Sequence, residues 1–96
     1  MPFLLLFLMI FSTPAFADFE TGRKAFAAGD YERAFTEWQA AAEQGDASAQ
    51  RNVGHLYRWG KGVSQDLTQA AYWYFTAAKN GSAGAQYNLG VMYLRG

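Results

Sequence analysis

The chain of 96 residues has no cysteine, a single histidine and no excess of either charge. Without cysteine it can form neither a disulfide framework nor a thiolate metal site, and one histidine cannot complete a zinc coordination shell. Eight basic and eight acidic side chains give a formal net charge of zero. Such a chain lacks the basic surface that binds nucleic acid or anionic membranes. We therefore expect no metal, no cofactor and no nucleic-acid partner.

The N-terminal segment has the pattern of a secretory signal. An apolar run covers residues 3–11, and the sequence Ala-Phe-Ala at 15–17 has the small-x-small form of a cleavage site. A membrane-spanning helix needs about 20 apolar residues, so no stable membrane anchor is expected. We predict that residues 1–17 are a cleaved signal peptide and that the remaining 79 residues (96 − 17) are exported to a bacterial periplasm or secreted.

The rest of the chain is poor in aliphatic side chains and rich in rings. Residues 18–96 contain no isoleucine and seven leucine or valine residues, against thirteen aromatic residues. We expect a core in which large rings fill the space beside small residues. The rings are predicted to be Trp38, Tyr57, Tyr74 and Tyr93, and the small residues Ala49, Gly54, Ala85 and Gly90.

An internal repeat organises this part of the sequence. The segments GDASAQRNVGHLYRWG (45–60) and GSAGAQYNLGVMYLRG (81–96) share eight of sixteen residues at a spacing of 36 (81 − 45). The same spacing relates Asp30 to Asp66, and Trp38 to Tyr74. A fixed period of this length is typical of a solenoid of repeated helix pairs.

Cap residues give the helix boundaries. Four residues with good N-cap chemistry open the expected helices: Asp30, Asp46, Asp66 and Ser82. Asp66 and Gln69 have the spacing of a capping box, and Gly45 and Gly81 fall where left-handed residues end helices. We therefore predict helices over residues 19–28, 31–44, 47–59, 67–80 and 83–95.

The glycines around Lys61 are predicted to form a loop. In YRWGKGVSQD (57–66) the glycines are too close together for a Walker phosphate loop, and no strand precedes them. Residues 60–65 are therefore expected to connect two helices.

The motifs of residues 45–96 resemble the Sel-one-like repeat, a relative of the tetratricopeptide repeat. The matching residues are Ala49, Val53, Gly54, Tyr57, Gly60, Gly62, Val63, Asp66, Ala70, Trp73, Tyr74, Ala77 and Ala78. The resemblance implies an all-α fold, a right-handed α-solenoid of antiparallel helix pairs whose first helices line a concave groove for protein partners. It implies structural motif positions and no catalytic residue.

On this basis the chain divides into four parts. They are the signal (1–17), a tetratricopeptide-like helix pair (18–44), a Sel-one-like repeat (45–80), and the first helix of an incomplete further repeat (81–96). Solenoids usually stack at least three repeats, so the open final repeat allows self-association.

The expected function is that of a noncatalytic adaptor or scaffold that binds a protein or peptide on its solenoid surface. One alternative is a terminal fragment of a larger scaffold with no separate activity. An enzyme of the cell envelope is a third reading, for which the sequence offers no catalytic constellation.

Candidate binding residues occupy variable positions between the motifs. Two trios lie at helical spacings of three and four: Arg51, His55 and Arg58, and then Tyr87, Val91 and Leu94. Their functional reading is a groove for an acidic or amphipathic peptide, and the alternative is a solvated face. Tyr72 and Phe75 in the run YWYF form either an exposed aromatic patch, which is typical of interfaces, or contacts with neighbouring helices.

Overall fold

The computed structural model describes residues 19–95 and is all-helical over that range. The helices are α2 (Phe19–Ala27), α3 (Tyr31–Glu43), α4 (Ala47–Trp59), α5 (Leu67–Lys79) and α6 (Ala83–Arg95). All five begin at the predicted residue, and α2, α3 and α5 end one residue earlier than predicted. The predicted signal peptide, residues 1–17, lies outside the described residues, as does Gly96.

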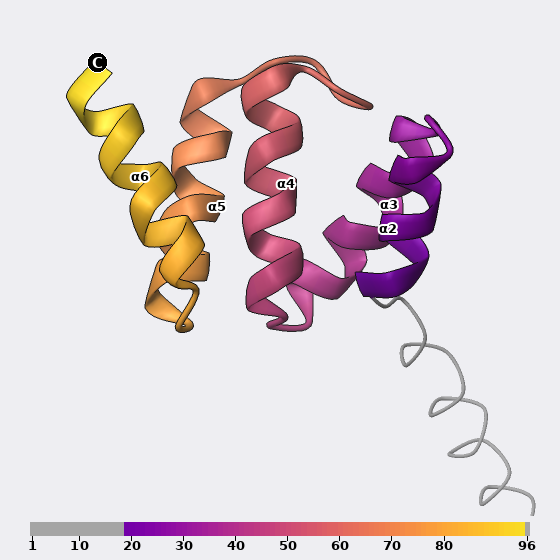
Figure 1. The fold of residues 1–96 in the computed structure, drawn as a ribbon, viewed down its shortest axis with the longest axis horizontal. Coiled ribbons are helices and arrows are strands. Elements are labelled where there is room, and N and C mark those ends of the chain that lie inside the picture. The colour runs from indigo at the N-terminus through magenta and orange to yellow at the C-terminus, as the bar shows by residue number, and fades with distance from the viewer. Residues whose placement is uncertain (1–18, 96) are drawn as a thin grey trace, which may run out of the picture.

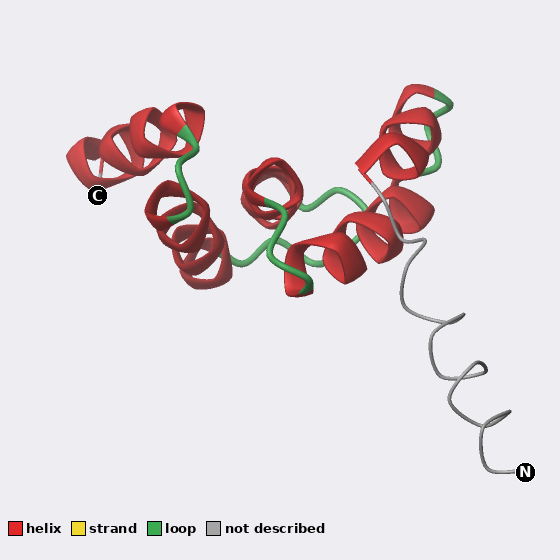
Figure 2. Ribbon diagram, turned by 90° about the horizontal axis from the view of Figure 1, so that it is seen from below, coloured by secondary structure: helices red, strands yellow, loops and turns green. Residues whose placement is uncertain are grey.

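The helices form a curved stack in which each packs against the next along the chain (Figure 1). Figure 2 shows α2, α4 and α6 in one row on the concave side, with α3 and α5 in a second row behind them. This arrangement confirms the predicted α-solenoid of helix pairs. None of the helices within residues 19–95 combines the length and apolar character needed to cross a bilayer.

The predicted N-caps are present at four helix starts. The side chains of Asp30, Asp46 and Asp66 accept hydrogen bonds of 3.2, 3.1 and 3.0 Å from backbone N–H groups three residues later. Ser82 accepts a corresponding bond of 3.0 Å from Ala85. Each cap stabilises its helix by about 1 kcal/mol. The predicted capping box at Asp66 is wrong in its second half, because the Asp66 N–H donates to the carbonyl oxygen of Tyr57 instead.

Residues 60–65 form the predicted loop between α4 and α5, and its glycines are needed for two different reasons. Gly60 ends α4 in the left-handed conformation with φ of 70°. Gly62, with φ of 74°, lies against the backbone carbonyl of Tyr31 at the start of α3, where a Cβ atom would clash. The loop thus fastens the second helix pair onto the first.

The core is built mainly from alanines and rings, together with Val53 and Leu56. A Cβ atom at Gly54 would lie 2.7 Å from the ring of Tyr74, and the ring of Trp38 covers Gly22 in the same way. Tyr57 packs edge-on against Phe35, with ring centroids 5.4 Å apart. The prediction that Tyr93 fills core space is wrong, because its side chain is 86% exposed. Its neighbour Gly90 has no heavy atom within 4 Å of a Cβ position, since no described helix covers this side of α6.

Candidate partner-binding surface

A pocket of about 250 Å³ opens between α2 and α4, the first two helices of the concave row shown in Figure 2. Most of its wall is apolar, and its polar groups come from three side chains. The lining residues are Arg23, Phe26, Trp38, Asn52, His55, Leu56 and Trp59. The pocket is large enough to accept one bulky side chain of a partner.

Trp38 of α3 anchors the pocket. Its indole N–H donates a hydrogen bond of 2.9 Å to the carbonyl oxygen of Phe19. Its ring also lies 5.7 Å, between centroids, from the rings of Phe19 and Phe26. A buried tryptophan whose N–H is satisfied gives a rigid apolar surface. Leu56, which is fully buried on α4, completes the apolar wall.

His55 lies where the pocket meets the second helix pair. Its ring stacks on Trp59, with centroids 4.8 Å apart and planes 3° from parallel, and its Nδ1 lies 2.7 Å from the phenol oxygen of Tyr74. Burial and, to a smaller extent, the positive charges of Arg51 and Arg58 together lower the pKa of His55 from 6.5 to about 4. The imidazole is therefore neutral at pH 7.

Tyr74 interacts with both His55 and Arg58. Its phenol oxygen lies 2.7 Å from Nδ1 of His55. Burial raises the pKa of the Tyr74 phenol, so the group stays protonated, while Arg58 acts on that pKa in the opposite direction. The three polar side chains are thus grouped beside the pocket.

Arg51 links α4 to α6. Its Nε donates a hydrogen bond of 3.0 Å to the side-chain oxygen of Asn88, and its guanidinium lies against Gly84. The predicted trio of Arg51, His55 and Arg58 is therefore brought together, but each member is half-buried, and Arg51 and His55 bond to other residues of the chain. The trio borders the pocket, and its role in binding stays a prediction.

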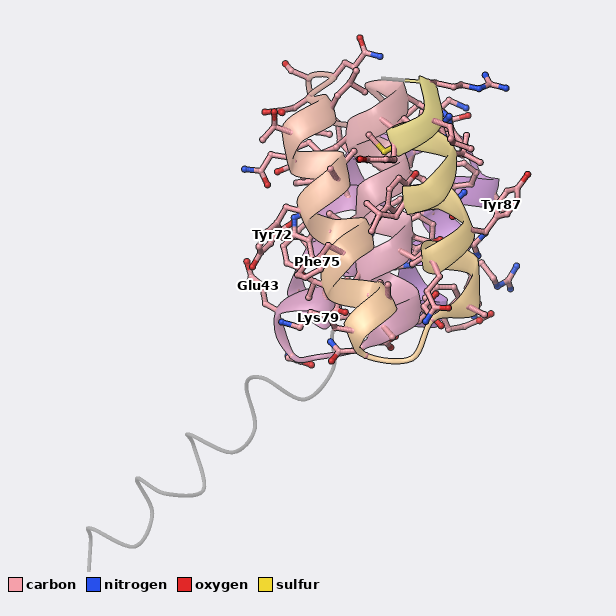
Figure 3. The ribbon with its side chains drawn as sticks, turned by 90° about the vertical axis from the view of Figure 1, so that its left-hand side faces the viewer. Glu43, Tyr72, Phe75, Lys79 and Tyr87 are labelled. Atoms are coloured by element: carbon pink, nitrogen blue, oxygen red, sulfur yellow. The ribbon has the colours of Figure 1, made fainter. Side chains whose placement is uncertain are left out.

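The second predicted trio lies on α6, one repeat further along. Tyr87 and Leu94 are exposed and Val91 is half-buried. Figure 3 places Tyr87 on one side of the molecule and the pair of Tyr72 and Phe75 on the opposite side. The predicted binding residues thus belong to two surfaces.

Tyr72 and Phe75 lie on the convex side, where Figure 3 shows them close to Glu43 and Lys79. Tyr72 is 56% exposed and Phe75 52% exposed, which favours the aromatic patch over packing between helices. The ammonium group of Lys79 lies 5.2 Å from the centroid of the Phe75 ring. Whether this convex patch binds a partner stays a prediction.

Two rings of the pocket, Phe26 and Trp59, and the lysine beside it were not predicted from the sequence. Phe26 and Trp59 come from helices that are not adjacent in sequence, so no local pattern joins them. The ammonium group of Lys61 lies 5.6, 5.1 and 5.3 Å from the ring centroids of Phe26, Tyr31 and Trp59. The one signal available was the spacing of four between His55 and Trp59, which puts both rings on one face of a helix.

Comparisons with known proteins agree with the repeat architecture. A family model of the Sel1 repeat matches residues 19–46, 47–82 and 83–96. The chain is also similar to the crystal structure of a Sel1 repeat protein from Oxalobacter formigenes, with 38% identity and a TM-score of 0.64 over 67% of this chain. The match spans 26% of the length of that protein. No curated protein matches the chain.

Proposed function

The chain belongs to the Sel1 repeat family, and we propose that it is a noncatalytic module that binds a segment of another protein in the concave pocket between α2 and α4. Sel1 repeats are generally protein-interaction modules. The observation that carries the proposal is the pocket itself, which the rings of Phe26, Trp38 and Trp59 line between two helices of the concave row.

The pocket suits a large apolar side chain of the partner. Complete burial of a Leu or Phe side chain contributes about 1.5–3 kcal/mol to binding. Trp59 lines the pocket and is 49% exposed, so it has area left to bury. Tryptophan is among the residues most enriched at the energetic centres of interfaces.

The charges beside the pocket favour an acidic neighbour for that side chain. Arg51 and Arg58 are close enough to His55 to lower its pKa, while the imidazole itself stays uncharged at pH 7. A carboxylate on the partner would therefore meet the positive charges of Arg51 and Arg58 beside the pocket. We propose a partner segment with a bulky apolar side chain next to an aspartate or glutamate.

Two sets of variants test the location of the site. Asn52→Trp would fill the pocket from its rim, because Asn52 is half-buried and lines it. The matched change, Tyr72→Ala with Phe75→Ala, removes the convex patch on the opposite side. Affinity capture from a cell-envelope extract, followed by mass spectrometry, provides the measurement. We expect Asn52→Trp to lose the partner and the double variant Tyr72→Ala, Phe75→Ala to retain it.

The opposite result would place binding on the convex patch and overturn the pocket as the site. Loss in both variants, with helicity unchanged by circular dichroism, would also contradict the proposal. A capture experiment in which no stoichiometric partner is retained would favour the alternative of a terminal piece of a larger scaffold. That alternative draws support from the partial span of the Oxalobacter formigenes protein.

We also propose that the chain is exported to a bacterial periplasm or secreted. The apolar run at 3–11 and the Ala-Phe-Ala sequence at 15–17 support this proposal. Expression in a bacterial host and intact-mass measurement of the product provide the test. A periplasmic species beginning at Asp18 is expected, and an uncleaved cytoplasmic chain would refute export.

A further inference from the structure

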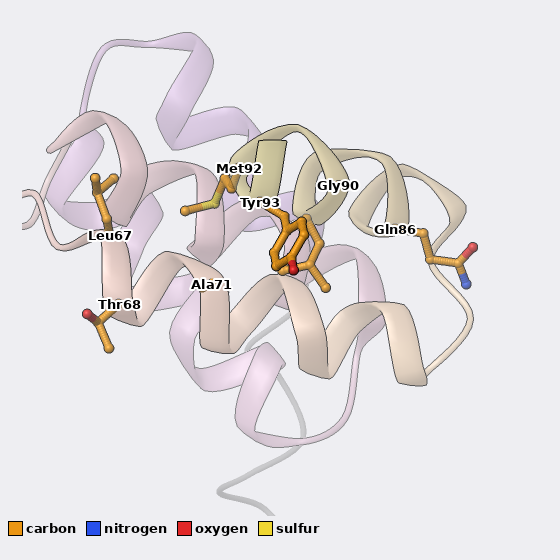
Figure 4. A pocket seen from close by; sticks show the side chains of 8 residues that line it. Leu67, Thr68, Ala71, Gln86, Gly90, Met92 and Tyr93 are labelled. Atoms are coloured by element: carbon orange, nitrogen blue, oxygen red, sulfur yellow. The ribbon is translucent and has the colours of Figure 1, made fainter. Parts of the chain in front are cut away.

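A second hollow lies on the side of α5 and α6 that no described helix covers. Its volume is about 760 Å³, and Figure 4 shows the side chains around it. None of its eight lining residues is charged. Leu67 and Tyr93, which both line it, are 53% and 86% exposed. We call this hollow the α5–α6 groove.

The backbone at Gly90, in this groove, is a position that an aromatic ring can cover. Gly54 of α4 lies under the ring of Tyr74, and Gly22 of α2 lies under the ring of Trp38. Gly90 is the equivalent of Gly54 one repeat later (90 − 54 = 36), yet nothing lies within 4 Å of its Cβ position. In the preceding two helix pairs this glycine position is covered by a ring, so the same position on α6 has the backbone shape to receive one.

A second difference between the repeats enlarges the groove. In the preceding repeat Tyr57 meets the ring of Phe35, and one period later the corresponding residues are Tyr93 and Ala71. Both Tyr93 and Ala71 line the groove, and the alanine methyl group cannot replace the contact that Phe35 makes. Within residues 19–95, Tyr93 is consequently left without an aromatic partner, and it is largely exposed.

The remaining surface of α6 is also apolar. Where α4 carries Arg51, His55 and Arg58, α6 carries Tyr87, Val91 and Leu94. The only charged residue of α6 is Arg95 at its end. A helix that is apolar beyond the face covered by its neighbour is typical of a helix buried on several sides.

We propose that a second copy of this chain covers the α5–α6 groove, with the two α6 helices antiparallel and the Tyr93 ring of each seated over Gly90 of the other. Gly90 and Tyr93 are three residues apart and so lie on one face of α6. In a twofold interface, if residue 93 of one copy contacts residue 90 of the other, the reverse contact also forms. The helix α6 therefore provides both the Tyr93 ring and the Gly90 position that this ring covers in the partner copy.

The charge distribution fits this occupant. Residues near a twofold axis meet their own copies, so a charged groove would repel itself. The uncharged lining of the groove avoids that repulsion. The proposal does not depend on the concave pocket between α2 and α4, which lies away from this surface.

Sedimentation velocity of the purified chain from about 1 to 100 μM tests the proposal, because this range covers dimer dissociation constants in the micromolar region. A concentration-dependent dimer is expected. Tyr93→Ala removes the ring, and Gly90→Trp fills the space above residue 90 that the ring of the other copy would occupy. Each variant should raise the dimer dissociation constant at least about tenfold. Gly90 has open space around its Cβ position, so the tryptophan should not disturb the fold of the monomer.

Tyr87→Ala is the matched control. Tyr87 is another exposed tyrosine of the same helix, 73% exposed, but it does not line the groove. This variant should dimerise like the unmodified chain, and circular dichroism should give equal helicity for all variants. A chain that stays monomeric at 100 μM would overturn the proposal. So would dimers of Tyr93→Ala or Gly90→Trp as tight as the original, or equal weakening by Tyr87→Ala, which would place association elsewhere.

Discussion

The ring of Tyr74 lies directly over Gly54, so closely that a Cβ atom at residue 54 would be 2.7 Å from two ring carbons. Tyr74 is completely buried. The ring and the glycine lie on α5 and α4, the two helices of one repeat, and they set how closely these helices approach. Because Gly90 has the same place in the next repeat and no ring above it, the two glycines offer a controlled comparison.

Gly54→Ala is expected to lower the free energy of unfolding by about 1–2 kcal/mol. Forcing an extra methyl group into a filled core costs about 1–3 kcal/mol, and alanine returns about 0.5–1 kcal/mol through its higher helix propensity. Urea unfolding followed by circular dichroism provides the measurement.

Gly90→Ala is the control, because it makes the same chemical change in open space. It should raise the free energy of unfolding by about 0.5–1 kcal/mol, measured at a protein concentration where the unfolding midpoint no longer depends on concentration. Equal effects of the two substitutions, in either direction, would show that the ring of Tyr74 does not restrict residue 54.

The helices could be predicted because their signals are local or periodic. Asp30, Asp46 and Asp66 each bond an N–H three residues later, which is a contact written in the sequence itself. The spacing of 36 then carried the boundaries of α4 and α5 from one repeat to the next. The α-solenoid followed from these two signals.

The surfaces could not be predicted, because they depend on contacts between different helices. His55 was expected to face either a partner groove or solvent, and the sequence did not show that it stacks on Trp59 and bonds to Tyr74, which lies 19 residues away on α5. Periodicity also misplaced Tyr93, since its equivalent Tyr57 is packed by Phe35 and Tyr93 finds only Ala71 in that place. Equivalent positions in a repeat share backbone geometry but not neighbours.

The neutral state of His55 makes stability dependent on pH. The pKa of this group is about 4 in the folded chain and 6.5 in the unfolded one. The unfolded state therefore binds more protons than the folded state between these pH values. The stability that depends on neutral His55 is complete above pH 6.5 and is lost as the pH falls toward 4. Since the ring is half-buried and partly screened by solvent, we expect a loss of about 1 kcal/mol between pH 7 and pH 5.

The variant His55→Asn isolates this effect from the titration of carboxylates. Asparagine can still accept a hydrogen bond from Tyr74 but does not titrate. Chemical unfolding of both proteins at pH 7 and pH 5 should give a smaller pH effect for the variant by about 1 kcal/mol. Identical pH effects in the two proteins would mean that His55 titrates normally in the folded chain.

Lys61 is expected to fasten the loop between α4 and α5 through its charge. Its ammonium group lies within 6 Å of the ring centroids of Phe26, Tyr31 and Trp59, and it precedes Gly62, whose backbone packs on Tyr31. Each cation–π contact at a partly exposed site contributes about 0.5–1 kcal/mol. Lys61→Met, which keeps a long apolar side chain and removes the charge, should lower the free energy of unfolding by about 1 kcal/mol. It should also speed amide hydrogen exchange in residues 60–65, because these residues lose their attachment to the first helix pair.

Lys61→Arg keeps a cation that also binds aromatic faces, and it should restore most of the protection. If Met protects the loop as well as lysine does, apolar packing of the side chain holds the loop and the cation is irrelevant.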